Sequence, residues 1–414
     1  MNGFTRRTLV AGTASAILTT GTAGKLRAQA AKPLRIGVIL PLSGPQAVFG
    51  KDVQIGAQIA ADNLKGAGGG SVELVFRDDK ADPNQAVAAA RELSGDGINL
   101  FIAGLFTPTA LAIAGILADL DAVLITCGAV ADSLTHEKYN RNVFRIHDHT
   151  FLKCQGLSRL MAERYSDVTS WAGIFADIES GWNSYKSFVS GAKKFYPELA
   201  KQAPTFTTPI ATKFGTSDFK NQISQLMSQP AQGLFFNVNG DEAVTFFAQA
   251  RPFGLASKFK VFADIGQELL LAKALTKNTP PNFWSGSHWY YGAYTDNAVS
   301  KMLYDGYVAR TGNASPAGYA SVSHSGVLAF AAAAKAAGST TTAVMIAMLE
   351  GLRFESARGT VTFRKEDHQA IGETNFIKLG PLDSDPGWIV SEFARIPSVT
   401  TVEPASPGVA LKYD

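Results

Sequence analysis

The sequence predicts an α/β protein with two Rossmann-like lobes and parallel-rich sheets. Short apolar runs alternate with segments whose apolar residues recur at helical spacing, the pattern of successive strand–helix units. This alternation occupies the chain up to Arg145 and starts again after it. A chain of 414 residues also exceeds what one hydrophobic core usually organises. We therefore expect two units, each with a sheet covered by helices on both faces.

The first unit is predicted from aliphatic and β-branched runs that end at Pro, Gly or acidic residues. Expected strands are 34–40, 72–76, 100–103 and 123–126, and expected helices are 53–64, 86–93 and 111–120. Ligands of such folds bind at the carboxyl ends of the parallel strands. The loops that follow these strands are therefore the places where we expect a site.

The second unit repeats the same alternation after Arg145. Expected helices are 151–165, 182–194, 218–229 and 242–254, and expected strands are 170–175, 204–210, 233–238 and 259–263. Later segments add helices at 299–311, 325–337 and 342–349 and strands at 359–363 and 373–379. We expect the Pro-containing tail from Pro397 to be loosely ordered.

The first thirty residues differ from the rest. Arg6-Arg7 precede a weakly apolar stretch of Ala, Thr and Gly, and Ala28-Gln29-Ala30 has the small residues that suit a signal peptidase. The apolar stretch is shorter than the roughly 20 residues of a membrane span, which argues against an anchoring helix. We predict a twin-arginine-type signal over 1–30, a mature start near Ala31 and a periplasmic location.

Composition narrows the class of protein. Hydrophobic residues make up 46% and charged residues 18%, typical of a globular chain, and the net charge is only +3. Lys and Arg are scattered among acids, which argues against a nucleic-acid partner. Cys127 and Cys154 either pair or are two buried thiols, and the sequence leaves both open. His147-Asp148-His149 suggests a metal site only weakly, because no third ligand is evident.

Several motifs follow one another in a fixed order. They are 36–45 with Phe49-Gly50, Asp78-Asp79, Asp82-Pro83, 102–107, 125–129, 249–251 and 253–255. In this order they resemble the leucine-binding type of periplasmic solute-binding proteins of ATP-driven (ABC) importers. That family includes branched-chain amino-acid binders and relatives for aromatic acids, amides and urea.

The resemblance implies a type I periplasmic-binding-protein architecture with three crossovers between the lobes. We place these crossovers near His149, His288 and Phe363. Lobe 1 is then 31–149 with 288–362, lobe 2 is 150–287 with 363–396, and 397–414 is a tail. The same resemblance implies a monomer that needs no cofactor, closes on a small solute and delivers it to an inner-membrane permease.

The resemblance also implies ligand-binding positions. They are Phe49, Phe106, Thr107, Gly128, Ala129, Val130, Ser180, Trp182, Asn237, Asn239 and Asp264. Aromatic side chains would form walls, the Thr107 hydroxyl and the amides of 128–130 would hold a carboxylate, and Asp264 would pair with an ammonium group. Each has a purely structural alternative, such as core packing for Phe49 or helix capping for Asp264.

Two departures from the family pattern broaden the expected ligand class. Val130 replaces a Ser or Thr whose hydroxyl helps to hold the carboxylate of an amino acid, and Asp264 is one residue from the best register. An aromatic or apolar carboxylate is therefore a candidate beside branched-chain amino acids. The sequence contains no GxSxG or HExxH motif, so we expect a binding protein, with an exported sensor or enzyme as alternatives.

Overall fold

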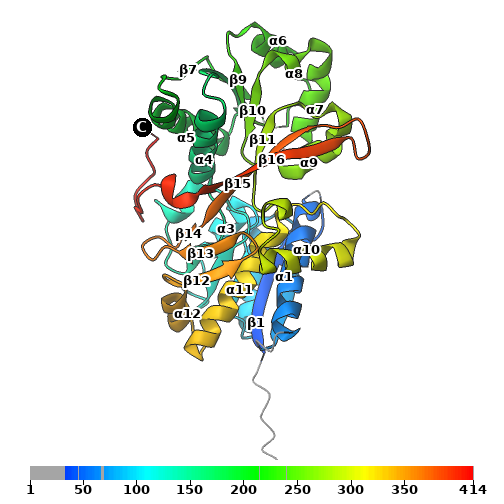
Figure 1. Ribbon diagram of the computed structural model, residues 1–414. Helices are drawn as coiled ribbons and strands as arrows, with labels where there is room; N and C mark the ends of the chain where they lie inside the picture. Colours follow the sequence, from blue (N-terminus) through cyan, green and yellow to red (C-terminus); the bar gives the residue numbers. More distant parts are fainter. Residues whose placement is uncertain (1–32, 45, 67–69, 214, 239, 414) are drawn as a thin grey trace, which may run out of the picture. The chain divides into compact units, whose positions relative to one another are not determined.

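The computed structural model describes residues 33–413 except 45, 67–69, 214 and 239. The predicted export signal, the predicted start at Ala31 and Asn239 lie outside the described residues. Figure 1 shows two separate sheets with helices around each of them.

The first sheet has five parallel strands in the order β2-β1-β3-β4-β5. They are β1 (Leu34–Leu40), β2 (Val72–Asp78), β3 (Leu100–Ala103), β4 (Val123–Thr126) and β5 (Val143–Arg145). Alternate residues of β1 enter different cores: Val38 packs with α1 (Ala47–Gly66), α11 (Ala320–Ala337) and α12 (Thr342–Leu349), and Ile39 packs with α2 (Pro83–Gly95) and α3 (Thr107–Ala114). Helices therefore cover both faces, as strand alternation requires.

A three-stranded antiparallel sheet completes this part of the molecule. It consists of β12 (Arg353–Ser356), β13 (Gly359–Phe363) and β14 (Ala370–Ile371). Phe363 and Ala370 belong to the same core as Val38. Helix α10 (Ala298–Thr311) packs against α1. We call the region 33–146 with 298–371 the small-sheet half.

The second sheet has eight strands in the order β16-β15-β11-β10-β9-β6-β7, with β8 also paired to β6. They are β6 (Ser170–Ala176), β7 (Thr205–Phe206), β8 (Ile210–Thr212), β9 (Gly233–Asn237), β10 (Val261–Asp264), β11 (Phe283–Ser287), β15 (Glu373–Pro381) and β16 (Trp388–Pro397). β15 runs antiparallel to both β11 and β16. We call the region 150–287 with 373–397 the large-sheet half.

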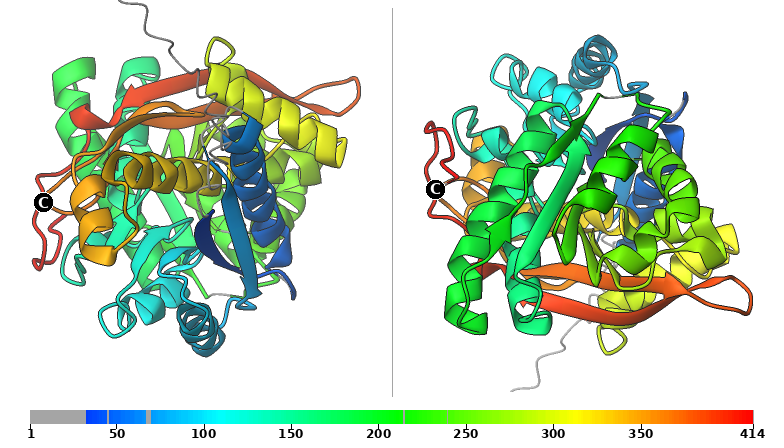
Figure 2. Two further views of the ribbon diagram at one scale, coloured as in Figure 1. Left: turned by 90° about the horizontal axis from the view of Figure 1, so that it is seen from below. Right: turned by 90° about the horizontal axis from the view of Figure 1, so that it is seen from above.

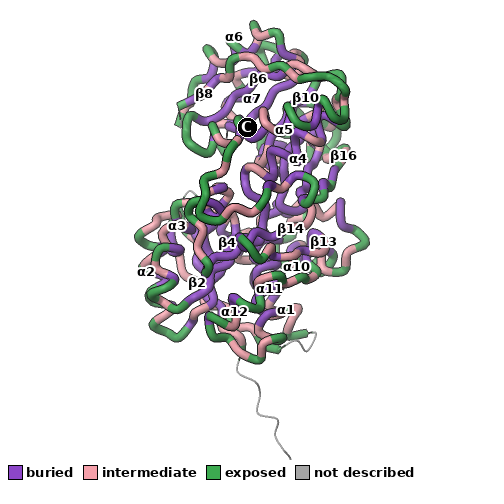
Figure 3. The backbone as a smooth tube through the Cα atoms, turned by 90° about the vertical axis from the view of Figure 1, so that its left-hand side faces the viewer, coloured by how far each residue is buried: buried purple, intermediate pink, exposed green. Residues whose placement is uncertain are grey.

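Helices cover the second sheet on both faces as well (Figure 2). They are α4 (Thr150–Arg164), α5 (Glu179–Phe195), α6 (Lys220–Ser228), α7 (Gly240–Ala250), α8 (Leu255–Lys258) and α9 (Glu268–Leu275). Phe236 packs with α6, α7 and α9, whereas its neighbour Phe235 packs with α4 and α5. The inner strands β1, β3, β4, β6, β9, β10 and β11 are buried over most of their length (Figure 3).

The chain passes between the halves at 146–149, at 288–297 and at Gly372. We had expected the third passage near Phe363, but it lies further along the chain. The reason is that β14 still pairs with β13 of the small-sheet half before β15 begins. Short turns are η1 (Asp132–Thr135), η2 (Tyr196–Ala200), η3 (Arg251–Phe253), η4 (Thr276–Asn278), η5 (Tyr291–Ala293) and η6 (Ser398–Thr400).

The tail that we expected to be loosely ordered from Pro397 is fixed at its start. β16 extends to Pro397, and Ser398, Thr401 and Glu403 beyond it are buried. The tail contacts the small-sheet half through Arg364 and the large-sheet half through Phe151, so its prolines end a strand without releasing the chain from the protein.

Cys127 and Cys154 are both buried and free. They lie in the cores of different halves, which decides the alternative that the sequence had left open. Among the described residues no single helix is long and apolar enough to cross a membrane, and α11 and α12 reach that length only together, across a bend of 109°.

Candidate ligand-binding site

The small-sheet half brings two of the expected aromatic residues together at the ends of its strands. Phe49 lies in the first turn of α1 and Phe106 immediately precedes α3. Their rings meet edge to face, with centroids 6.3 Å apart, and Phe49 makes a second such contact with Tyr319 at 5.2 Å. Tyr319 was not predicted, because it precedes a helix that is distant in the sequence.

The expected carboxylate-binding loop follows β4. The Ala131 amide donates to the Thr107 hydroxyl at 3.4 Å, which brings Thr107 to this loop. The Ala129 amide, however, donates to the Gly104 carbonyl at 3.0 Å, so it is already used inside the protein. Among the described residues the amides of Gly128 and Val130 have no hydrogen-bond partner. These two amides and the Thr107 hydroxyl are the groups of this loop that can contact a ligand.

Trp182 and Ser180 lie in the first turn of α5, and both are exposed. Trp182 remains 38% exposed, although its indole N–H donates to Asp177 at 2.8 Å and its ring packs on the edge of Phe175. An accessible ring that is fixed on one side can serve as a wall for a ligand.

The side chain of Asn237 has a structural role that the sequence did not show. At the end of β9 it is buried, and its amide donates to the Ser184 hydroxyl at 2.6 Å. This contact joins β9 to α5.

Asp264 ends β10 and is only 1% exposed. Its Oδ2 accepts hydrogen bonds from the amides of Gly266 and Gln267 and from the Ser285 hydroxyl, at 2.9, 2.8 and 2.6 Å. These bonds close the turn after β10; the N-cap of α9 is Gln267, so Asp264 does not have the capping role that we considered. Its Oδ1 is buried without a partner among the described residues, and burial raises the pKa of Asp264 to about 6. An unpaired buried carboxylate oxygen is costly, and a ligand donor would remove that cost.

Glu268, at the start of α9, joins the large-sheet half to the chain that leaves β11. Its Oε1 accepts from the amide of His288 at 3.0 Å and lies 2.6 Å from the Nδ1 of the same residue. Its Oε2 accepts from the amide of Gly318 at 2.6 Å. The sequence analysis missed Glu268, although its place just after a strand end was an available signal.

The rings of several residues form a continuous row from the small-sheet half to the end of β11. His288 contacts Tyr319 at 4.7 Å between ring centroids and His147 at 5.7 Å, and the Nε2 of His147 lies 3.4 Å from the Thr126 hydroxyl. Burial lowers the pKa of both histidines well below the usual value, so both are neutral. The row therefore presents aromatic and neutral polar surface beside Phe49.

Lys153 is a buried ammonium group in the first turn of α4, only 3% exposed. Burial lowers the pKa of Lys153, against the attraction of Glu268, Asp148 and Asp264. No sequence motif pointed to this residue.

The side chains of His147-Asp148-His149 contact different residues. His147 contacts Thr126, Asp148 binds Arg358 at 3.2 Å, and His149 binds Asp132 at 2.8 Å, so the three side chains have different partners. The described part of the chain contains no group of three or more His, Cys, Asp or Glu residues able to hold a metal ion.

A family model described as periplasmic binding protein matches residues 33–383. The chain belongs to the periplasmic binding protein family. The match covers the five-stranded parallel sheet, the passages between the halves and every strand of the eight-stranded sheet except β16.

The relatives of this periplasmic binding protein are solute-binding proteins. One is a leucine-, isoleucine-, valine-, threonine- and alanine-binding protein of Pseudomonas aeruginosa, 26% identical over 59% of this chain and 64% of its own length. Another is a Leu/Ile/Val-binding protein homolog of Brucella abortus, 25% identical over 80% of this chain and 86% of its own. The match to a homolog from Brucella melitensis is 37% identical but spans only 31% of that protein.

Solved structures show the same fold. An amino-acid ABC transporter substrate-binding protein from Pseudomonas fluorescens superposes with a TM-score of 0.76 at 19% identity, covering 92% of this chain and all of that one. A solute-binding protein from Rhodopseudomonas palustris in complex with 3,4-dihydroxybenzoic acid gives 0.73 at 18% identity, with 88% and 98% covered. An isoleucine complex from Streptococcus pneumoniae gives 0.71 at 20%, with 88% and 100% covered.

Proposed function

We propose that this protein is the periplasmic solute-binding component of an ATP-driven importer and catalyses no reaction. It binds one small carboxylate between its two halves and delivers it to an inner-membrane permease. Membership of the periplasmic binding protein family supports the binding role and export to the periplasm. Among the relatives are binders of branched-chain amino acids, and among the structural neighbours are complexes with isoleucine and with a dihydroxybenzoic acid.

The observation that carries this proposal is the unpaired oxygen of Asp264. A buried carboxylate oxygen without a donor is compensated when a ligand supplies an N–H group. The ammonium of an amino acid is such a donor. Its carboxylate would meet the Thr107 hydroxyl and the amides of Gly128 and Val130, and its side chain would lie against Phe49. An aromatic acid shares the carboxylate and the ring contact but leaves Asp264 unpaired.

The test measures how Asp264→Asn changes the affinity for amino acids and for aromatic acids. The mature protein is screened by thermal shift with branched-chain and aromatic amino acids, hydroxybenzoates, short amides and urea, and calorimetry gives the affinity of each hit. A ligand that binds only the folded state raises the melting temperature. For an amino acid, Asp264→Asn should weaken binding at least about tenfold, the loss of one charge-assisted hydrogen bond.

Asp218→Asn, at an exposed position, is the matched control and should leave affinity unchanged. If an aromatic acid is the ligand, Asp264→Asn changes its affinity little, and the amino-acid assignment fails. If no compound raises the melting temperature, the proposed carboxylate function itself is overturned.

The carboxylate loop is tested separately by Thr107→Ala. We expect weaker binding with little change in melting temperature, because the hydroxyl accepts only one long hydrogen bond, 3.4 Å, from within the protein. Unchanged affinity with a lower melting temperature would make Thr107 a structural residue.

A further inference from the structure

The C-terminal segment 398–413 has two parts that differ in burial. At its start, Ser398, Thr401 and Glu403 are buried, with Glu403 only 6% exposed. Residues 407–410 and 412 are exposed. Local opening costs least where few groups are buried, so the first part is the fixed end of the segment and the second part is the releasable end.

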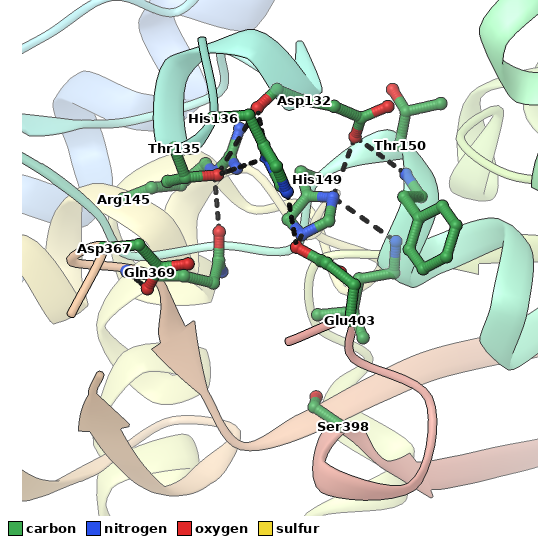
Figure 4. Close-up of polar contacts among 12 residues, drawn as sticks. Asp132, Thr135, His136, Arg145, His149, Thr150, Asp367, Gln369, Ser398 and Glu403 are labelled. Atoms are coloured by element: carbon green, nitrogen blue, oxygen red, sulfur yellow. Dashed lines mark hydrogen bonds and ion pairs between the residues drawn. The ribbon is translucent and has the colours of Figure 1, made fainter. Parts of the chain in front are cut away.

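The fixed end is attached where the chain passes between the halves (Figure 4). The Glu403 carboxylate lies 3.0 Å from the Nε2 of His149, which precedes α4, and 3.6 Å from the Nε2 of His136. The Glu403 carbonyl accepts a hydrogen bond from Arg364 at 2.7 Å. The other ring nitrogen of His149 lies 2.8 Å from Asp132. These contacts attach the tail at the first passage and beside η1.

The releasable end follows the line between the two halves. The Gly408 amide donates to the His136 carbonyl at 2.7 Å, and the Tyr413 hydroxyl donates to Asp132 at 3.0 Å, both in the small-sheet half. The Tyr413 ring lies 6.3 Å from that of Phe151, in the first turn of α4 of the large-sheet half. The end of the tail therefore contacts both halves at once.

Two cavities show that this end is loosely packed. One of about 200 Å³ lies between the tail, the loop after β4 and the first turn of α5, with Asp132, Glu179 and Tyr413 in its walls. One of about 400 Å³ lies between the tail and helices α4 and α5. Space on the inner side of a segment removes packing contacts that would otherwise hold it.

We propose that residues 404–413 form a strap that holds the two halves at the separation seen here and is released when they open further. The proposal rests on the proposed function, in which the halves move about the passages to admit a ligand. The loop after β4 belongs to one half and the first turn of α5 to the other. When they separate, the contact of Tyr413 with Asp132 or its contact with Phe151 must break. The strap thus acts on the equilibrium between conformations, and through it on ligand affinity.

The strap is tested by removing it while its fixed end remains. A chain that ends at Pro404 keeps Glu403 and loses the Tyr413 contacts. Spin labels on Arg91→Cys in α2 and Ser224→Cys in α6, both exposed, report the separation of the halves. The natural cysteines are buried and stay unlabelled. In the ligand-free protein we expect the distance distribution of the truncated chain to broaden toward longer separations.

Tyr413→Phe removes only the hydrogen bond to Asp132 and should shift the distribution in the same direction by less. Tyr304→Phe, which loses one surface hydrogen bond to the Ala314 carbonyl, is the matched control and should shift nothing. In each variant, ligand affinity should fall in proportion to the fraction of molecules that still have the wild-type separation of the halves.

An unchanged distribution in both the truncated chain and Tyr413→Phe overturns the strap. If the truncated chain folds poorly, the distribution of Tyr413→Phe decides alone. The outcome is independent of the proposed function, because distances are measured without ligand. If the wild-type protein binds none of the compounds screened, the proposed function fails while the distances still decide the strap.

Discussion

His149 is a buried imidazole whose charge depends on two carboxylates from different parts of the chain. Burial alone would lower the pKa of His149, but Glu403 and Asp132 raise it to about 9 from 6.5. Burial alone would raise the pKa of Glu403, but His149 lowers it to about 2 from 4.5. The two residues therefore form an ion pair across neutral pH, and the pair stabilises the fold at the root of the tail.

The sign of each shift gives the pH range in which this pair stabilises the protein. The raised pKa of His149 contributes stability that is complete below 6.5 and is lost as the pH rises through about 9. The lowered pKa of Glu403 contributes stability that is complete above 4.5 and is lost as the pH falls through about 2. Both contributions are complete only between pH 4.5 and 6.5.

Glu403→Gln should therefore destabilise the protein most between pH 4.5 and 6.5, by about 3–5 kcal/mol for a broken buried pair. Denaturant unfolding of both proteins across the pH range measures the difference, which should shrink toward pH 9. Glu392→Gln, which breaks exposed pairs with Arg164 and Lys378, is the control. A difference that stays constant with pH would show that Glu403 is not paired with a charged His149.

The net effect of the Lys153 charge on the stability of the fold can be measured by removing it. Because burial disfavours the charged form of Lys153 and lowers its pKa, Lys153→Met should raise the melting temperature, by about 2 °C or more. Lys186→Met on the exposed side of α5 should change it little. A fall for Lys153→Met would mean that Glu268, Asp148 and Asp264 need this cation as a partner.

Helix α5 reaches the end of β6 only because a glycine lies at the contact. A methyl group on Gly181 would stand 2.0 Å from the Ala176 carbonyl oxygen, in a backbone that has no room to move. Gly181→Ala should lower the free energy of unfolding by about 1–3 kcal/mol and displace the turn that carries Trp182. Gly95→Ala, where no atom lies within 4 Å, should be neutral or slightly stabilising. Equal values for the two variants would exclude the clash.

At the level of elements, the sequence predicted those strands and helices whose apolar residues follow one clear periodicity. The aliphatic runs of β1, β3, β4, β9 and β10 and the repeated helices between them follow directly from periodicity. β16 was missed because the expected strands were continuous apolar runs, whereas Ser391, Glu392 and Arg395 interrupt the apolar residues of β16. β14 was missed because a strand of two residues carries no periodicity. For that reason we placed the third passage near Phe363, whereas it lies at Gly372.

The site was predictable only in part for a similar reason. Phe49, Thr107 and Asp264 lie after strand ends, where a local pattern is informative. The use of the Ala129 amide by Gly104 and the bond of Asn237 to Ser184 depend on backbone approaches between distant segments. Tyr319 and Lys153 are brought to the same region by helices that carry no motif, so no signal near them in the sequence could identify them.

At the scale of the whole molecule, one free thiol lies in the core of each half and can report whether the halves unfold together. Burial raises the pKa of Cys127 and Cys154 well above the usual range, so neither reacts in the native state. The halves share three passages and are joined by contacts such as the hydrogen bond from the Gly318 amide to Glu268. We expect both thiols to become reactive at the same denaturant concentration in timed alkylation followed by mass spectrometry. Earlier labelling of one thiol would show that its half opens independently.

The order of the strands also constrains when the protein can become complete during synthesis. The small-sheet half takes its last strand, β14, from near the end of the chain, and the large-sheet half adds β15 and β16 at its edge only afterwards. While a ribosome is still translating the chain, neither half has all its strands, and β11 keeps an open edge that β15 later covers. A nascent chain stalled before residue 373 should therefore need a chaperone at that edge, and the native state becomes available only once the polypeptide leaves the exit tunnel.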